Sequence, residues 1–152
     1  MKHYYTTIRY WYCNTKISMY IITIILNAGD TYTMINDYNT AVNTYEKAGN
    51  AYKSAAEVDN ISPEERVKYY IEAAEYYNNA KNYEKAALHY LFAAEANNKH
   101  EYYKNADKSI RNTSFYNENN NIKYSWEILK NKYNDNTDSK EYKAITNRIN
   151  AL

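Results

Sequence analysis

The sequence has few of the residues that end helices, form tight turns or cross-link a chain. Of its 152 residues only two are glycine, one is proline and one is cysteine. So little glycine and proline disfavours strands joined by tight hairpins and favours long helices. The lone Cys13 excludes a disulfide within the chain and a cysteine-based zinc site. The composition therefore predicts an all-α protein, and the length fits a single domain over residues 1–152.

Motifs of catalytic or cofactor chemistry are also missing from the sequence. It contains no glycine-rich phosphate loop, no H-E-x-x-H motif, no Glu-x-x-His pair and no nucleophile elbow. We expect His89 to occupy a polar or half-buried helix face rather than to bind a ligand. Basic residues are neither dense nor interleaved with aromatic ones, which argues against nucleic-acid binding. We therefore expect a protein that is not an enzyme and has no catalytic residue, cofactor or metal.

Charge is unevenly distributed along the chain, although the net charge is only +1. Residues 1–27 carry three basic and no acidic side chains, and residues 28–98 carry six basic against eleven acidic ones. Residues 99–152 reverse the balance, with ten basic against seven acidic side chains. An acidic middle between basic ends says more about binding partners than the total charge does.

A five-residue pattern, small-small-polar-any-Tyr, recurs along the first two thirds of the chain. Its copies begin 20, 25 and 20 residues apart, and the last copy has lost its Tyr. A repeat with a double step of 45 residues is typical of stacked helix pairs. The pattern predicts repeats that are clearest over 28–97, degenerate over 99–135, and followed by a terminal helix over 138–150. The copies are Ala28–Tyr32, Ala48–Tyr52, Ala73–Tyr77 and Ala93–Asn97.

Local signals predict where several helices begin and end. Ser62 is predicted to form a capping box with Glu65, three residues later. Pro63 follows Ser62 directly, at the first helical position that proline prefers. Short turns are expected over 34–38 and 80–83, each closing a helical hairpin. Beyond them we expect a third, degenerate hairpin and a terminal helix capped by Asp138 with Glu141. The expected helices of this last part are 101–115, 122–133 and 138–149, with a polar turn over 117–121.

The most apolar stretch is Ile17–Leu26, and its ten residues are too few to span a bilayer. It has three readings. It could be a buried first helix, a patch that touches a membrane, or the apolar part of a signal peptide. The residues that would touch a membrane are Ile21, Ile22, Ile24, Ile25 and Leu26.

Three segments resemble the soluble NSF attachment proteins (SNAPs), a tetratricopeptide-like family with long helices. They are Ala48–Val58, Arg66–Glu95 and Ala106–Tyr133, and the resemblance extends over about residues 28–135. It implies a right-handed array of antiparallel helical hairpins, an α-solenoid of about six or seven helices. In this family the inner face grips the four-helix SNARE bundle through basic side chains, and a C-terminal cap recruits the NSF ATPase.

The resemblance implies a protein adaptor of membrane fusion and vesicle-mediated transport, monomeric, cytoplasmic and peripheral at membranes. The partner would be a SNARE four-helix bundle, and an NSF-type ATPase is a further candidate partner. Because the chain is about half the family's usual length, we expect the part that engages the ATPase to be missing. A truncated regulator that competes with full-length SNAP is therefore one alternative, and a tetratricopeptide scaffold for peptide ends is another. The candidate partner-binding residues are Lys104, Lys108, Arg111, Lys123 and Lys130.

Overall fold

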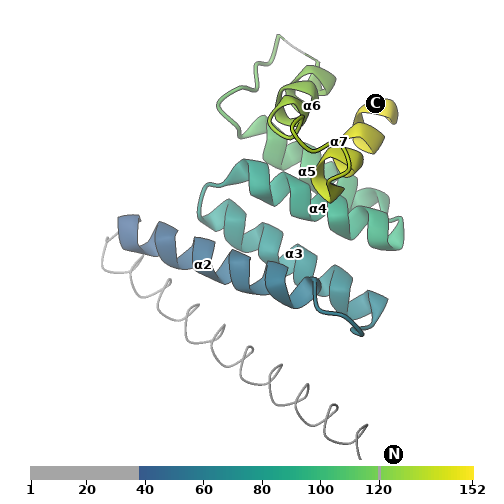
Figure 1. The fold of residues 1–152 in the computed structure, drawn as a ribbon. Coiled ribbons are helices and arrows are strands. Elements are labelled where there is room, and N and C mark those ends of the chain that lie inside the picture. The colour runs from purple at the N-terminus through teal and green to yellow at the C-terminus, as the bar shows by residue number, and fades with distance from the viewer. Residues whose placement is uncertain (1–37, 120) are drawn as a thin grey trace, which may run out of the picture.

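The computed structural model describes residues 38–119 and 121–152, and within these ranges all regular structure is helical (Figure 1). The all-α prediction is confirmed. The residues predicted to touch a membrane, Cys13 and the first copy of the five-residue pattern lie outside the described ranges. The six helices are α2 (Tyr38–Ala56), α3 (Pro63–Asn79), α4 (Tyr83–Asn97), α5 (His100–Arg111), α6 (Ile122–Asn131) and α7 (Lys140–Asn150).

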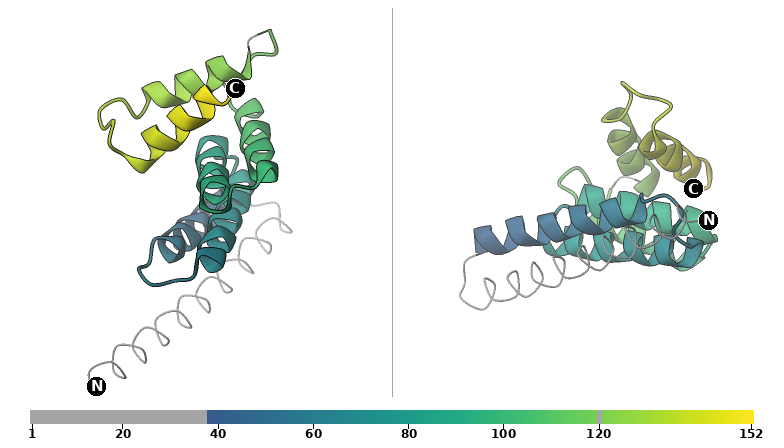
Figure 2. Two further views of the ribbon diagram at one scale, coloured as in Figure 1. Left: turned by 90° about the vertical axis from the view of Figure 1, so that its right-hand side faces the viewer. Right: turned by 60° about the horizontal axis from the view of Figure 1, so that its bottom comes forward.

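Helices α2, α3, α4 and α5 form a row in which each helix packs against its neighbours in sequence (Figure 1). Helices α6 and α7 form a hairpin of their own, and α7 packs back against α4. Figure 2 shows α2 to α4 nearly end-on in its left view while α6 and α7 are seen from the side, so this hairpin crosses the row. The expected array of sequential helix pairs is thus observed, but its last pair joins α6 with α7 and leaves the line of the row.

The recurring pair of small residues lies at the contacts between neighbouring helices. Ala48, Ala73, Ala74, Ala93 and Ala94 all have no exposed surface. A small residue on one helix lets a large side chain of the next approach its backbone closely, which is how ridges fit into grooves. The repeat therefore encodes close helix packing.

The main core runs through the row and continues between the row and the crossing hairpin. Its members come from α2 to α7, and each fully buried large side chain contributes about 1.5–3 kcal/mol of hydrophobic free energy. On α6, Trp126 and Leu129 belong to this core and Ile122 packs against it. The largest buried apolar side chains are Trp126, Tyr70, Tyr77, Phe92, Leu91, Ile110, Leu129 and Ile145.

Most predicted helix starts are observed. Ser62 accepts a hydrogen bond from the Glu65 amide at 3.1 Å, and the Glu65 carboxylate accepts one from the Ser62 amide at 3.2 Å. The turn between α3 and α4 places Lys81 at a φ of 57°, and Asn82 then caps α4. At α7 the prediction was wrong by one residue. Ser139, not Asp138, accepts from the Tyr142 amide, because its extended backbone places its hydroxyl over the first turn.

Two helices end earlier than predicted. Helix α5 stops at Arg111 because Asn112 and Thr113 turn their amides to carbonyls three residues back, and the Thr113 hydroxyl also donates to the Ile110 carbonyl at 2.6 Å. Helix α6 stops at Asn131 through the same kind of three-residue bond, made by Lys132 and Tyr133. These tight turns satisfy terminal carbonyls that would otherwise be unpaired.

We predict that Gly49→Ala lowers the free energy of unfolding by about 1–3 kcal/mol, although an alanine usually stabilises a helix relative to glycine. The added Cβ would lie 2.9 Å from the Tyr77 ring. That ring is buried, and its hydroxyl is held by Asn50 at 2.8 Å. Urea denaturation followed by circular dichroism measures the change. The control is Ser54→Ala at an exposed position of the same helix, and a Gly49→Ala variant as stable as this control would contradict the prediction.

Candidate protein-binding surface

Asp107 on α5 attaches the crossing hairpin to the row. Its Oδ1 accepts hydrogen bonds from Trp126 Nε1 at 2.9 Å and from Arg148 Nε at 3.1 Å, and its Oδ2 accepts from an Arg148 terminal nitrogen at 2.5 Å. All three side chains are largely buried, and the Arg148 guanidinium also lies 5.4 Å from the centre of the Tyr103 ring. One carboxylate thus joins α5 to both α6 and α7.

The hairpin covers only one face of the row. On α4 it contacts Phe92 through Lys140 and Glu95 through Asn147. Tyr90 lies two positions before Phe92, and Asn97 lies two positions after Glu95. Each therefore points about 200° around the helix from the residue that the hairpin contacts. Within the described ranges, no helix packs on the opposite face of α3, α4 and α5.

A groove follows α4 along this open face. Its floor includes Tyr83, Tyr90 and Asn97, which are seven residues apart and so lie in one line on the helix. Helices α3 and α5 form the two walls. The Ser109 hydroxyl of α5 donates to Asn78 Oδ1 of α3 at 3.2 Å, which joins the walls above the floor.

Two hollows lie along this groove. The first, of about 280 Å³, has amide, phenol, hydroxyl and ammonium groups and no carboxylate in its lining. It is lined by Asn78, Tyr83, Tyr90, Asn105, Lys108, Ser109 and Asn112. The second, of about 490 Å³, combines apolar walls with a charged rim. It is lined by Pro63, Glu64, Val67, Lys68, Ile71, Glu72, Ala96, Asn97, Lys99 and Tyr102.

Three of the five predicted binding residues share one stripe of α5. Lys104, Lys108 and Arg111 are three or four residues apart, are exposed, and make no ion pair within the described part of the chain. Lys108 also lines the first hollow. The other two, Lys123 and Lys130, are half-buried on α6, and the Lys130 ammonium lies 4.8 Å above the Tyr142 ring of α7.

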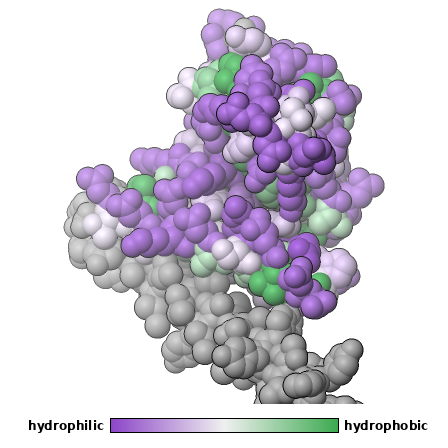
Figure 3. All heavy atoms as spheres, in the orientation of Figure 1, coloured by the Kyte–Doolittle hydropathy of each residue, from purple (hydrophilic) through white to green (hydrophobic). Residues whose placement is uncertain are grey.

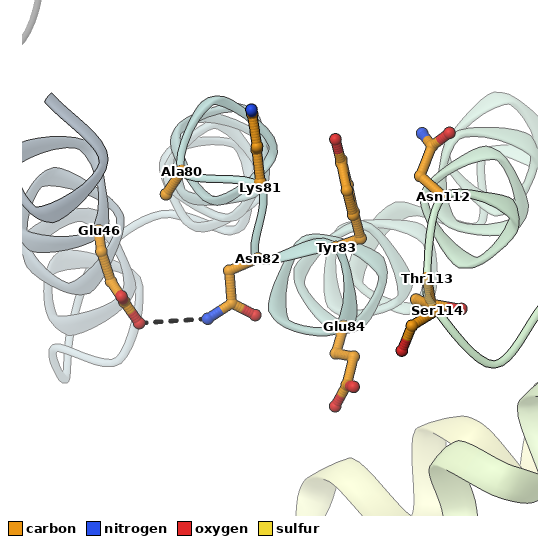
Figure 4. A pocket seen from close by; sticks show the side chains of 9 residues that line it. All are labelled: Glu46, Ala80, Lys81, Asn82, Tyr83, Glu84, Asn112, Thr113 and Ser114. Atoms are coloured by element: carbon orange, nitrogen blue, oxygen red, sulfur yellow. Dashed lines mark hydrogen bonds between the residues drawn. The ribbon is translucent and has the colours of Figure 1, made fainter. Parts of the chain in front are cut away.

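A third hollow, of about 450 Å³, lies at the turn between α3 and α4 (Figure 4). Glu46 of α2 is one of its lining residues, and its Oε1 accepts from Asn82 at 3.1 Å and from the Lys85 ammonium at 2.7 Å. The Lys85 hydrogen bond holds the pKa of this carboxylate below its usual value. Figure 4 shows Tyr83 and Glu84 pointing to opposite sides of the turn. Glu46 thus links α2 to the turn and to α4 within this hollow. Its carboxylate already accepts hydrogen bonds from Asn82 and Lys85.

His89 is buried, contrary to the expected polar or half-buried face. Its Nδ1 lies 2.7 Å from the Lys85 carbonyl oxygen, which can only accept, so Nδ1 carries the proton. Its Nε2 has no hydrogen-bond partner among the described residues. The rings of Tyr77, Phe92 and Tyr70 lie 4.9, 5.4 and 6.1 Å from it, centre to centre. Burial lowers the pKa of His89 to about 4, so the imidazole is neutral at neutral pH.

Sequence reasoning did not assign the tyrosines and asparagines that line the groove to a binding surface, and it placed Tyr83 and Tyr90 on a stripe that faces neighbouring helices. The seven-residue spacing of Tyr83, Tyr90 and Asn97 was available as a signal. However, such a stripe is equally typical of a core face, and only the position of the crossing hairpin decides which face of α4 is open.

Comparison of the chain with protein-family models, with curated proteins and with solved structures gave no match. The described residues form an all-helical domain whose six helices pack as sequential pairs. Within the described ranges no helix is long and apolar enough to cross a membrane. The face visible in Figure 3 is mostly hydrophilic with small hydrophobic spots. No group of three or more metal-binding side chains occurs among the described residues.

We predict that Asp107→Ala lowers the free energy of unfolding by about 3–5 kcal/mol, because it leaves the Arg148 charge and the Trp126 indole N–H without a partner in a buried site. Asp107→Asn should cost less, since its amide oxygen can still accept from Trp126. Urea denaturation gives both values. Asp138→Asn is the control, because that carboxylate is exposed and its ion pair with Lys143 is at the surface. An Asp107→Ala variant as stable as this control would show that the anchor contributes nothing.

We predict that His89 makes the protein less stable as the pH falls from 7 to 5. The unfolded chain takes up a proton near pH 6.5, whereas folded His89 does so only near its pKa of about 4. Protons therefore favour the unfolded state across this window, which lowers the free energy of unfolding by about 2 kcal/mol. His89→Leu should flatten the pH dependence measured by urea denaturation, whereas His100→Ala, at an exposed position, should not. Equal slopes in wild type and His89→Leu would refute this assignment.

Proposed function

We propose that the protein is a non-catalytic adaptor that binds helical segments of another protein through the open face of α3, α4 and α5. The observation that carries the proposal is the basic stripe of α5, whose cations form no ion pair with any described residue. Lys85 and Lys132 form ion pairs with Glu46 and Glu84 within the fold. The cations of the stripe instead face solvent beside a groove. Cations that the fold leaves free are available for an acidic partner, and such contacts give orientation and fast association.

A SNAP-like role in membrane fusion is the specific form of this proposal. It is supported by a row of helices that pack consecutively, with α2, α3 and α4 of 19, 17 and 15 residues. The partner would then be a four-helix SNARE bundle at the cytoplasmic side of a membrane. A stable complex of this kind buries about 1,200–2,000 Å² and weakens with salt where its contacts are charged.

A tetratricopeptide-like scaffold for peptide ends is the second candidate. The feature that favours it is the lining of the first hollow, which contains three asparagines and one lysine. Amide and ammonium groups suit a peptide backbone and a terminal carboxylate. A truncated regulator that competes with SNAP can be told apart in a SNARE disassembly assay. The regulator would inhibit disassembly, whereas an adaptor would stimulate it.

We predict that reversing the stripe with Lys104→Glu, Lys108→Glu and Arg111→Glu weakens binding to a purified SNARE bundle at low salt by at least about tenfold. Biolayer interferometry with the full chain measures the affinity. The matched control, Lys47→Glu with Lys81→Glu and Lys143→Glu, makes the same charge change at exposed positions outside α5. If the wild-type chain binds no bundle, or if both triple variants bind like wild type, the SNAP-like proposal fails.

A further inference from the structure

Resting on the proposed function, we propose that the groove along α4 seats one amphipathic helix of the partner. Its apolar ridge would enter the second hollow between Ile71 and Tyr102. Its two flanks would carry opposite charge, with the acidic flank against α5 and the basic flank against α3.

The second hollow lies about two helical turns away from the bond that joins the two walls. Helices α3 and α5 run in the same direction, because α4 reverses the chain between them. The bond from Ser109 to Asn78 joins residues 31 positions apart and sets their register. Two such short side chains can meet only where the helix backbones are close. The same offset places Tyr102 opposite Ile71, and both residues line the second hollow.

The second hollow has an apolar interior that no described residue fills. Val67 is buried at its base, Ile71 and Tyr102 are half-buried, and Ala96 is exposed. At about 490 Å³ the hollow has room for a leucine or phenylalanine side chain from a partner. Covering Ile71 and Tyr102 would add apolar burial to a surface that is otherwise charged and polar.

The two walls carry opposite charge. The exposed or half-buried charged residues of the α3 rim are three glutamates and one lysine, namely Glu64, Lys68, Glu72 and Glu75. The α5 rim has four basic residues and one glutamate, namely Lys99, Glu101, Lys104, Lys108 and Arg111. None of these nine side chains forms an ion pair within the described part of the chain. The rims therefore complement a helix with one acidic and one basic flank.

The opposite charges of the two walls fix the direction of the bound helix. A helix turned end for end in a groove exchanges the flanks that face the two walls. Only one direction places acidic side chains against α5 and basic ones against α3, and the other direction brings like charges together. Like charges facing each other across an interface are strongly unfavourable. The partner's helix should therefore bind in a single direction.

The test uses designed peptides of about 20 residues, long enough to form helix alone. The first has a leucine ridge with Glu along one flank and Lys along the other. The second has the same composition, but Glu and Lys alternate on each flank. Fluorescence anisotropy with the full chain at low salt should show about tenfold tighter binding of the first peptide. Equal affinities, or no binding of the first peptide, would overturn the inference.

Two variants locate the bound peptide. Ala96→Phe fills the second hollow from an exposed position and should abolish binding without loss of thermal stability. Lys104→Glu with Lys108→Glu should weaken the first peptide about tenfold, while Lys47→Glu on α2 should not. Full binding by Ala96→Phe would place the peptide elsewhere and refute the proposed seat.

The result is separable from that for the SNARE bundle. A chain that binds the bundle but neither peptide contradicts only the seating of a helix in the groove. Conversely, a chain that binds the first peptide selectively but no bundle supports the groove and contradicts the SNARE partner.

Discussion

The surface that this protein offers to a partner depends on where Asp107 fastens the C-terminal hairpin. A single carboxylate accepts three hydrogen bonds from two helices, with both donors largely buried. Removing it would leave a buried charge unpaired, so α6 and α7 are held at one place on α5. Because α7 then crosses α4 on the side of Phe92, no described helix covers the side of Tyr90. The anchor thus chooses the binding face without taking part in it.

Small residues supply the second constraint. Alanine pairs without exposed surface at the helix contacts bring backbones close, and Gly49 leaves room for the Tyr77 ring within its buried contact. A row packed this tightly buries large aromatic rings whose polar atoms then need partners. Tyr77 reaches Asn50 and Tyr70 accepts from Lys140, whereas His89 Nε2 finds none among the described residues. Close packing therefore stabilises the row but leaves one titratable group sensitive to acid.

Local hydrogen bonds made the helix starts predictable from the sequence. The packing of the last hairpin depends on long-range contacts, which the sequence does not show. Ser62 and Asn82 act on amides three residues away, so their signals can be read from a short window. Ser139 was missed because Asp138 matched the same signal one position earlier. The crossing of the last hairpin depends on Asp107, which meets Arg148 from 41 residues away, and no local pattern reports such a pairing. The basic residues of α5 were predicted from the charge of the last third and the family resemblance, but the groove beside them required the position of α7.

Charge distribution connects the fold to its proposed use. On the face covered by the hairpin, cations are paired or packed, as with Lys132 on Glu84 and Arg148 on Asp107. On the open face, nine charged side chains of α3 and α5 have no ion-pair partner within the described ranges. Ion pairs between the acidic side chains of α3 and the basic side chains of α5 would help to stabilise the fold, and Asn78 and Ser109 already join these two walls. A groove whose acidic and basic walls stay apart therefore fits an element inserted between them, and a helix with two unlike flanks would satisfy both walls at once.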